Sequence, residues 1–333
     1  MIFYQDIEDI IFNRHEHFAC NQLVILSGYL GPSPVEKLST LPFQTTVIYG
    51  MYGSEGIKRS LHDSLIRLNH DISNIDVKYS TVPIHSKCYI WLNNGIVVYA
   101  LIGSANFSVN GLTTPFKEVL AETSRDSFSP LARYIAQISD LSIPCYLGVV
   151  SQLRRRIVPE ETALPIESTS EVICKISLFD LSTSRVPTRS GLNWGMASLG
   201  GSHVHIDDAY IPILKENIKK FPELFPPKQL FPQQGSEDGG RKRHNEAIEI
   251  IWDDGITMRG LLEGNQNEHG IIYPKQIASH PFKRTLGQYL RRRMNVPSGV
   301  PITIEHLDIY GRRDIEISLQ AEGIYLFNFA VSR

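Results

Sequence analysis

Short apolar runs alternate with a helical pattern in the first half of this chain. The runs at 22–30, 45–52 and 75–81 are rich in β-branched and aromatic residues, which is typical of β-strands. Between the last two, residues 54–70 repeat apolar side chains at helical spacing, with Ser54 as a candidate N-cap. The apolar positions are Ile57, Leu61, Leu65 and Leu68. Alternation of strand, helix and strand predicts a layered α/β domain.

The second half has a different pattern, in which short strand-like runs predominate. They cover residues 172–181, 247–254, 255–264, 270–277, 301–310, 314–320 and 323–331. Asp254-Gly255, between two of these runs, is a hairpin signal, because glycine tolerates the positive φ of a tight turn. One amphipathic stretch, 280–294, predicts a helix. Many short strands with few helices predict a mostly antiparallel barrel or sandwich.

Two domains are expected, because 333 residues exceed what one hydrophobic core usually serves. The polar stretch 159–172 contains two prolines and lies where the pattern changes, so we interpret it as a linker. A first domain is then expected over residues 1–158 and a second over 173–333. Within the second, the polar stretch 232–244 predicts a loop.

The composition excludes several classes of protein. No run of about 18 apolar residues is present, so a membrane span is not expected. The four cysteines are scattered, and the N-terminus lacks the pattern of a signal peptide, which together favour a cytoplasmic location. A net charge of -2 argues against a whole-protein attraction for polyanions. A local patch is possible, since residues 270–304 contain no acid and include six basic residues: Lys275, Lys283, Arg284, Arg291, Arg292 and Arg293.

The stretch 85–106 combines a hairpin pattern with polar ends. Asn94-Gly95 predicts a type I′ turn, because both central residues of that turn need positive φ. Pairing outward from this turn places His85 opposite Ser104, unless a bulge shifts the register. Paired residues, and residues two apart on one strand, project from the same face. Four polar side chains are therefore predicted to share one face at the open end: His85, Lys87, Ser104 and Asn106.

These four side chains suit a phosphate group. The ammonium, amide and hydroxyl groups can each donate to non-bridging phosphate oxygens, and the neighbouring Gly103 and Ala105 leave room for close approach. The histidine can attack phosphorus or transfer protons near neutral pH. The alternative is an edge strand whose polar residues face solvent. That alternative explains any one of the four residues more readily than all four on one face.

The pattern His-x-Lys followed by Gly-Ser-x-Asn resembles the signature of the phospholipase D superfamily, over roughly the first 150 residues. The aspartate that the family usually has five residues after the lysine is Leu92 here. Restriction endonucleases of this superfamily also lack that aspartate. The resemblance implies a downstream acid that supports the histidine. Glu118 is the best match, and Glu122 is the alternative.

The resemblance also implies a mechanism without a metal ion or other cofactor. His85 attacks phosphorus to form a phosphohistidine, and a second histidine protonates the leaving oxygen and then activates water. Lys87, Asn106 and Ser104 stabilise charge on the phosphate oxygens, as a metal ion does in other enzymes. The His-x-Lys motif occurs once in the chain, so a two-fold homodimer with one catalytic centre at its interface is expected.

The second half resembles the B3-like pseudobarrel DNA-binding domain, in its short strands, its basic helix and a segment rich in Gly, Asn, Trp and Ser at 189–213. In such domains two arms enter the major groove, and here they correspond to 188–195 and 259–267. The candidates for base contacts are Arg189, Asn193, Trp194, Arg259, Asn265 and Gln266. The candidates for phosphate contacts are Lys283, Arg284 and the run Arg291, Arg292 and Arg293. The alternative for the basic residues is a solvated surface, and for Trp194 it is packing.

The two resemblances together imply a type II-like restriction endonuclease of the BfiI or NgoFVII type, which cleaves double-stranded DNA in a bacterial restriction-modification system. The chain has no Gly-x-x-x-x-Gly-Lys-[Ser/Thr] motif, so any ATP would be used by a separate helicase-like ATPase subunit. Two other functions stay open. One is a lipid or small-molecule phosphodiesterase, and the other is a DNA-binding regulator with an inactive catalytic motif.

The run His203-x-His205-x-Asp207-Asp208 contains four residues of types that bind metal ions. Alternate residues on a strand share a face, so these side chains could in principle bind one ion. No further group of ligands is evident in the sequence, and we predict a surface strand or arm here in place of a metal site.

Overall fold

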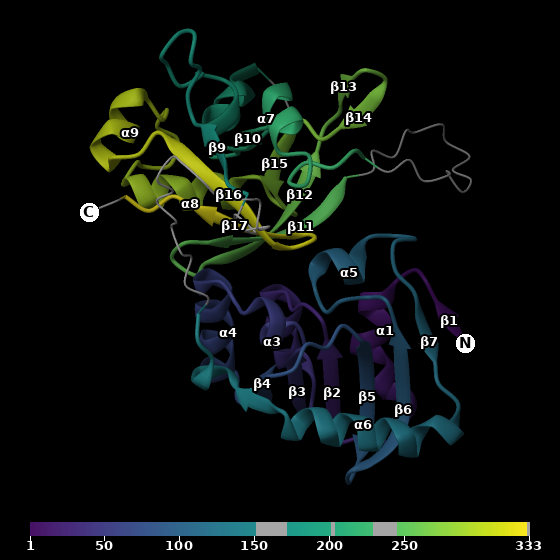
Figure 1. Ribbon diagram of the computed structural model, residues 1–333. Coiled ribbons are helices and arrows are strands. Elements are labelled where there is room, and N and C mark those ends of the chain that lie inside the picture. Colours follow the sequence, from purple (N-terminus) through teal and green to yellow (C-terminus); the bar gives the residue numbers. More distant parts are fainter. Residues whose placement is uncertain (151–171, 201–203, 229–244, 332–333) are drawn as a thin grey trace, which may run out of the picture.

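The computed structural model describes residues 1–150, 172–200, 204–228 and 245–331, which form two large β-sheets, a separate two-stranded hairpin and their helices (Figure 1). The predicted linker, apart from its last residue, lies outside the described residues, as do the predicted loop at 232–244 and His203. We refer to the described residues up to 150 as the N-terminal domain and to those from 172 as the C-terminal domain. None of the helices in these ranges has the length and apolar character that a membrane span needs.

The N-terminal domain is built on a mixed sheet with the strand order β1-β7-β6-β5-β2-β3-β4-β8. Its strands are β1 Ile2–Phe3, β2 Gln22–Ser27, β3 Gln44–Tyr49, β4 Ile75–Ser80, β5 Lys87–Asn93, β6 Ile96–Gly103, β7 Leu120–Glu122 and β8 Ser142–Pro144. β2, β3 and β4 are parallel, while β5 runs antiparallel to β2 and to β6. The three strands predicted at 22–30, 45–52 and 75–81 are confirmed, each somewhat shorter than its apolar run.

Helices cover both faces of this sheet (Figure 1). They are α1 Ile7–Asn13, α2 Pro32–Lys37, α3 Tyr52–Glu55, α4 Arg59–Asp71, α5 Val109–Thr113 and α6 Phe128–Asp140. α1, α2 and α4 contribute to one apolar core with one set of strand side chains. α6 packs on the alternate side chains of the same strands, through Ile135 and Ile138. Strands that are buried on both faces have continuous apolar sequences, which explains the pattern of the central runs.

The single helix predicted over 54–70 is wrong in one respect. The segment forms two helices, α3 and α4, because Gly56 has φ of 68° and ends the first. Ser54 lies inside α3 and does not cap a long helix. Ile57, which follows the break, is still fully buried, as are Leu61 and Leu65 in α4.

The β5–β6 hairpin has the predicted turn but not the predicted register. Asn94 and Gly95 have φ of 51° and 79°, as a type I′ turn requires. A bulge in β6 next to Val98 then shifts the pairing by one residue, so that Lys87 faces Gly103. Ser104 is therefore not opposite His85. The pairing with β5 ends at Gly103, and Ser104 begins a loop.

The C-terminal domain contains a nearly closed β pseudobarrel with the strand order β10-β15-β12-β11-β17-β16-β9. Its strands are β9 Cys174–Ser177, β10 Ile211–Pro212, β11 Glu246–Trp252, β12 Thr257–Glu263, β15 Gln276–Ser279, β16 Asp314–Ala321 and β17 Ile324–Asn328. A separate hairpin consists of β13 Gln266–Glu268 and β14 Ile271–Tyr273. The hairpin predicted at Asp254-Gly255 is confirmed, since β11 and β12 pair antiparallel on either side of it.

Among the described residues of this domain, the α-helices that accompany the sheet are α7 Lys215–Lys220, α8 Arg284–Met294 and α9 Ile304–Tyr310. α8 confirms the helix predicted at 280–294 and buries its apolar side. The strand predicted at 301–310 is wrong. Thr303 precedes α9 and donates its backbone N–H to His306 Nδ1 at 3.0 Å, and Gly311, with φ of 91°, ends the helix. The spacing of apolar residues at 301–310 is compatible with a strand or a helix. The capping contact at Thr303 and the glycine at 311 favour the helix.

The two domains share a packed interface. β11 and the strands beside it lie against α5, α2 and α4 of the N-terminal domain (Figure 1). Three C-terminal side chains, Ile251, Ile324 and Leu326, belong to the same apolar core as the strands and helices of the N-terminal domain. The C-terminal domain therefore covers the edge of the N-terminal sheet at which α5 lies, and the candidate site is at that edge.

Candidate active site

The site lies where three strand ends of the N-terminal sheet meet. β2 and β6 both end at this edge, whereas β5, which is antiparallel to both, begins there. Consequently Gly28 follows β2, Ser104 follows β6, and His85 comes just before β5. The topology brings together residues that are far apart in the sequence.

His85 and Lys87 form the centre of the site. The His85 side chain is exposed, while Lys87 is only 4% exposed. Lys87 Nζ lies 3.0 Å from His85 Nδ1 and donates to the backbone carbonyl oxygen of His85 at 2.6 Å. A buried ammonium group needs such partners. The contacts hold its charge directly beside an accessible imidazole.

Asn106 and Ser104 are oriented by backbone groups. Asn106 Oδ1 accepts a hydrogen bond from the backbone N–H of Tyr29 at 3.2 Å and lies 3.4 Å from Ser27 Oγ, whose O–H donates to the Tyr29 carbonyl oxygen at 2.6 Å. This leaves the amide nitrogen as the group that can donate to a ligand. Ser104 Oγ accepts from the backbone N–H of Val119 at 3.0 Å, so its O–H can also donate outward.

These side chains line one cleft of about 500 Å³. Its lining residues are Tyr29, His85, Lys87, Gly103, Ser104, Asn106, Glu118 and Glu322. The cleft thus contains three cationic or neutral donors, one imidazole and two carboxylates. Such a set can bind a phosphate between the donors and the imidazole.

Glu118 acts on Lys87 in this geometry. Burial lowers the pKa of the Lys87 ammonium, and the charge of Glu118 opposes that shift. Glu118 therefore helps to keep Lys87 protonated. The alternative acid, Glu122, is on β7 with its carboxylate 3.8 Å from the N-terminal ammonium group of Met1. Of the two acids, Glu118 is the one that lines the cleft.

Two neighbours of the site were not found from the sequence. Gly28 has no side chain, and a Cβ there would lie 3.3 Å from both Asn106 Oδ1 and His85 Cδ2. The Tyr29 ring meets His85 edge-on at 6.1 Å between centroids, and its hydroxyl donates to Glu55 at 2.7 Å. Both residues follow an ordinary buried strand, and only the tertiary contact shows their place.

Glu322 comes from the C-terminal domain. It lies in the turn between β16 and β17, and Lys117 Nζ donates to its carboxylate at 2.6 Å. The same Lys117 Nζ donates to Asn110 Oδ1 at 2.5 Å. The wall of the cleft is thus built partly from the second domain, which no local sequence pattern could have indicated.

Four of the predicted DNA contacts are exposed on the C-terminal domain: Arg189, Asn265, Arg284 and Arg292. The guanidinium group of Arg284 lies 4.7 Å from the centre of the Phe282 ring. These residues stay candidates for DNA contacts. Trp194 is half-buried and packs edge-on against Tyr210, with 5.7 Å between ring centroids, as the packing alternative expects.

Two of the residues predicted to contact DNA, Asn193 and Arg291, are buried and have structural roles. Asn193 is 1% exposed, and its side chain exchanges hydrogen bonds of 2.8 and 2.7 Å with the backbone of Ile302. Arg291 is 2% exposed, and its Nε lies 2.9 Å from Asp207 Oδ1. Both side chains are enclosed by protein and fasten loops of the C-terminal domain. The prediction of DNA contacts is corrected for these two residues.

Three further candidates are bound to other protein groups. Arg259 Nη2 is 2.6 Å from Glu8 Oε1 of α1, so it faces the N-terminal domain. Gln266 Nε2 donates to two backbone carbonyl oxygens, and Lys283 forms an ion pair with Glu263. A DNA contact by any of them would require it to exchange these partners.

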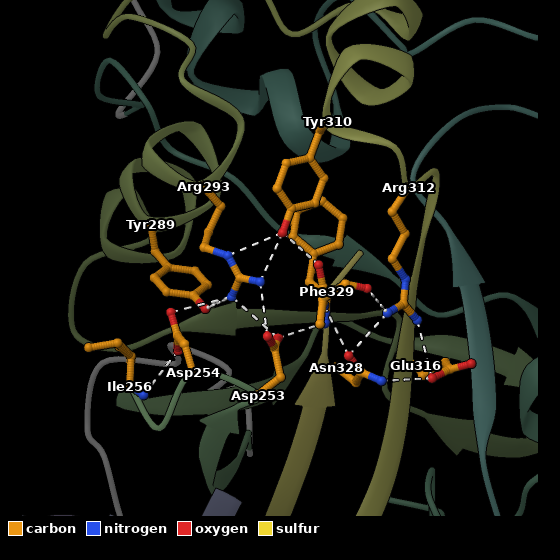
Figure 2. A network of polar contacts seen from close by, with 11 residues as sticks. Asp253, Asp254, Ile256, Tyr289, Arg293, Tyr310, Arg312, Glu316, Asn328 and Phe329 are labelled. Atoms are coloured by element: carbon orange, nitrogen blue, oxygen red, sulfur yellow. Dashed lines mark hydrogen bonds and ion pairs between the residues drawn. The ribbon is translucent and has the colours of Figure 1, made fainter. Parts of the chain in front are cut away.

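Arg293, the last of the three consecutive arginines, is the centre of a structural network (Figure 2). It donates to Asp253 Oδ2 at 2.9 Å, to the Tyr289 hydroxyl at 2.6 Å and to the Tyr310 hydroxyl at 2.8 Å. The Tyr310 hydroxyl in turn donates to the carbonyl oxygen of Phe329. The network joins α8 and α9 to the ends of β11 and β17, so the charge of Arg293 is used inside the domain.

The two aspartates among the candidate metal ligands, Asp207 and Asp208, have other partners. Asp207 binds Arg291 and accepts from the backbone N–H of Gly299 at 3.0 Å. Asp208 Oδ2 accepts from the backbone N–H of His205 at 2.8 Å. Within the described ranges, no group of three or more His, Cys, Asp or Glu side chains is arranged to hold a metal ion.

Comparison with known families decides the relationship. Residues 5–151 match the model of the NgoFVII restriction endonuclease N-terminal PLD domain. Residues 168–321 match the model of the NgoFVII C-terminal B3-like DNA-binding domain. The chain belongs to the NgoFVII restriction endonuclease family. Both resemblances stated from the sequence are thereby confirmed. The N-terminal domain of this NgoFVII-family chain is PLD-like and its C-terminal domain is B3-like (Figure 1).

Two solved structures are similar to part of this NgoFVII-family chain. NucT from Helicobacter pylori is 16% identical, with a TM-score of 0.30, over 41% of this chain and 87% of NucT. Nuc from Salmonella typhimurium, a phospholipase D family member, is 12% identical, with the same TM-score and coverage. No curated protein matches the chain.

Proposed function

We propose that this chain is a sequence-specific endodeoxyribonuclease that hydrolyses DNA phosphodiester bonds without a metal ion. One observation carries the proposal: the motif residues of a PLD-type nuclease line a single cleft in a chain whose other domain is of the B3-like DNA-binding class. The alternative of a lipid phosphodiesterase gains no support from a DNA-binding domain.

The geometry supports a covalent mechanism. His85 is exposed in the cleft, and its imidazole attacks phosphorus while the leaving oxygen departs from the opposite side. Lys87 Nζ, Asn106 Nδ2 and Ser104 Oγ donate to the non-bridging oxygens as negative charge builds up on them. Water then cleaves the phosphohistidine, returning the enzyme to its starting state. The net reaction is hydrolysis of one phosphodiester bond.

The mechanism needs a second histidine to protonate the leaving oxygen. The chain has a single His-x-Lys motif, and the other residues that line the cleft supply no second imidazole. We therefore propose a homodimer in which His85 of a second copy completes the site, as a two-fold axis through the cleft would allow. The exposed side of the cleft leaves His85 accessible to such a partner.

Plasmid cleavage in the presence of EDTA tests the proposed function. Wild-type protein is expected to produce discrete fragments in excess EDTA, because Lys87, Asn106 and Ser104 replace a metal ion. The measurement is gel electrophoresis, with His85→Ala protein as the control. Loss of cleavage on chelation would contradict the metal-free mechanism. A smear would contradict sequence specificity, and binding without cleavage would contradict the nuclease assignment.

A methyl group at Gly28 should slow catalysis. The added Cβ of Gly28→Ala would lie 3.3 Å from both Asn106 Oδ1 and His85 Cδ2, so these groups must move by a few tenths of an ångström. We expect kcat to fall about ten-fold, because small displacements of reacting groups are costly. The measurement is the rate of hydrolysis of bis(4-nitrophenyl) phosphate, with thermal unfolding as a check on stability. An unchanged kcat would show that the close approach at Gly28 is not needed.

A further inference from the structure

Glu249 brings a buried carboxylate from the C-terminal domain into the N-terminal domain. It lies on β11 and is 0% exposed. Its Oε1 accepts from the backbone N–H of Ser33 at 2.7 Å, and its Oε2 accepts from the backbone N–H of Val109 at 3.2 Å. At Gly31 a Cβ would come within 1.5 Å of Oε2, so glycine is required there for the carboxylate to enter.

The two donors belong to the segments that carry the site. Ser33 follows the loop that starts at Gly28 and Tyr29, and Val109 follows Asn106 by three residues. The segments are also bonded to each other. The backbone N–H of Gly31 donates to the carbonyl oxygen of Phe107 at 2.8 Å. Glu249 thus joins the first turns of α2 and α5, which directly follow the two loops that carry Tyr29 and Asn106.

A second set of contacts holds the same region. Asn110 Nδ2 donates to Glu246 Oε1 at 3.1 Å and to the carbonyl oxygen of Ala247 at 3.0 Å, both on β11. The β16–β17 turn also presses on Asn110, since a Cβ at Gly323 would lie 2.2 Å from Asn110 Cβ. The C-terminal domain therefore holds the residues immediately after Asn106 from two sides.

Burial of the Glu249 carboxylate is unfavourable in itself. Burial raises the pKa of the Glu249 carboxyl group, which means that enclosing its charge costs free energy. An apolar side chain would avoid that cost, but it would leave two enclosed backbone N–H groups without these acceptors. The carboxylate provides two acceptors at once, one for each loop.

We propose that the C-terminal domain positions Asn106 in the active site: Glu249 is a positioning residue that acts through Ser33 and Val109, and the β16–β17 turn acts through Asn110. This inference rests on the proposed function, because it assumes that the cleft hydrolyses phosphodiesters. The DNA-binding domain then has a second role, because it holds the catalytic groups in their relative positions.

Kinetics on a substrate that needs no DNA recognition test this inference. With bis(4-nitrophenyl) phosphate, Glu249→Ala is expected to lower kcat about 10- to 100-fold and to leave KM within about two-fold. Glu249→Gln keeps one acceptor oxygen and is expected to give an intermediate kcat. Glu316→Ala is the matched control, because Glu316 is a C-terminal carboxylate that binds Lys175 and Arg312 of its own domain. A folded Glu249→Ala protein with wild-type kcat would overturn the inference.

A glycine pair keeps the test decisive if Glu249→Ala does not fold. Gly323 and Gly299 both have φ of +75°, but a Cβ at Gly299 meets nothing closer than 3.9 Å. Gly323→Ala is expected to lower kcat at least ten-fold by displacing Asn110, whereas Gly299→Ala has the same backbone strain and should retain kcat. Equal rates for the two variants would overturn the inference.

The outcomes separate this inference from the proposed function. If the wild-type protein hydrolyses neither bis(4-nitrophenyl) phosphate nor DNA, the proposed function fails and the inference fails with it. If the wild-type protein is active and the Glu249 and Gly323 variants equal it, the positioning role alone is refuted.

Discussion

Replacing His85 by alanine should reduce DNA cleavage by a factor on the order of 10⁴ to 10⁶, as loss of the nucleophile does in other covalent hydrolases. The imidazole lines the cleft and is the proposed nucleophile, and Lys87, Asn106 and Ser104 cannot replace it because their proposed role is only to donate hydrogen bonds to the phosphate. The measurement is single-turnover cleavage of a plasmid. DNA binding, followed by gel mobility shift, should stay at the wild-type level, because the C-terminal domain is unchanged.

The same variant tests the homodimer. In a mixture with about nine-fold excess of His85→Ala subunits, a wild-type subunit pairs with another about one time in ten. If each centre needs His85 from both copies, the rate per wild-type subunit should fall about ten-fold after subunit exchange. A rate per wild-type subunit that does not change with dilution by the variant would refute a shared centre.

Lys87→Ala should lower kcat by about 10²- to 10³-fold, the usual cost of removing one charge-stabilising donor. The effect depends on charge, so it should also be visible in the pH profile of the wild-type enzyme. Burial lowers the pKa of Lys87 below its ordinary value of 10.5. The ammonium form exists below this pKa, so activity should be lost as the pH rises through it. The measurement is kcat on bis(4-nitrophenyl) phosphate across the alkaline range.

Glu118→Gln is the control for this assignment. The Glu118 carboxylate raises the pKa of Lys87 and so opposes the effect of burial. Without that charge, Lys87 should lose its proton at lower pH, and the alkaline limb should move to lower pH. A limb that stays in place in Glu118→Gln, or that persists in Lys87→Ala, would show that another group titrates.

The β5–β6 hairpin could be predicted from the sequence because the residues that specify it are neighbours in the chain. Asn94-Gly95 specifies the turn, and polar residues at both strand ends mark the site. The register could not be predicted, because the bulge at Val98 has no glycine or proline to reveal it. Ser104 and Asn106 nevertheless reach the cleft, since β6 ends at Gly103 and the loop takes a path that strand alternation does not describe.

Residues that act across the fold were not predictable in this way. Gly28 lies beside three motif residues, yet in the sequence it is one of 24 glycines. Glu249 occupies a strand position whose alternation suggests a solvated side chain, and only the interface shows that it is enclosed. The basic helix at 284–294 did not show which of its arginines could reach DNA. Arg291 and Arg293 form ion pairs with Asp207 and Asp253 inside the domain.

β11 and the β16–β17 turn contact the segments that carry the site, so they limit which parts of the C-terminal domain can be exchanged with those of a related protein. A chimera made by exchanging everything after the linker would replace Glu249 and Gly323 together with the DNA-reading surface, and it would separate both from Gly31 and Asn110, with which they fit. A graft that retains 246–252 and 319–326 keeps these contacts and replaces only the outer parts of the pseudobarrel. If the proposed function holds, we expect that specificity can be exchanged by grafting the outer surface, whereas β11 and the β16–β17 turn must be kept together with the nuclease domain.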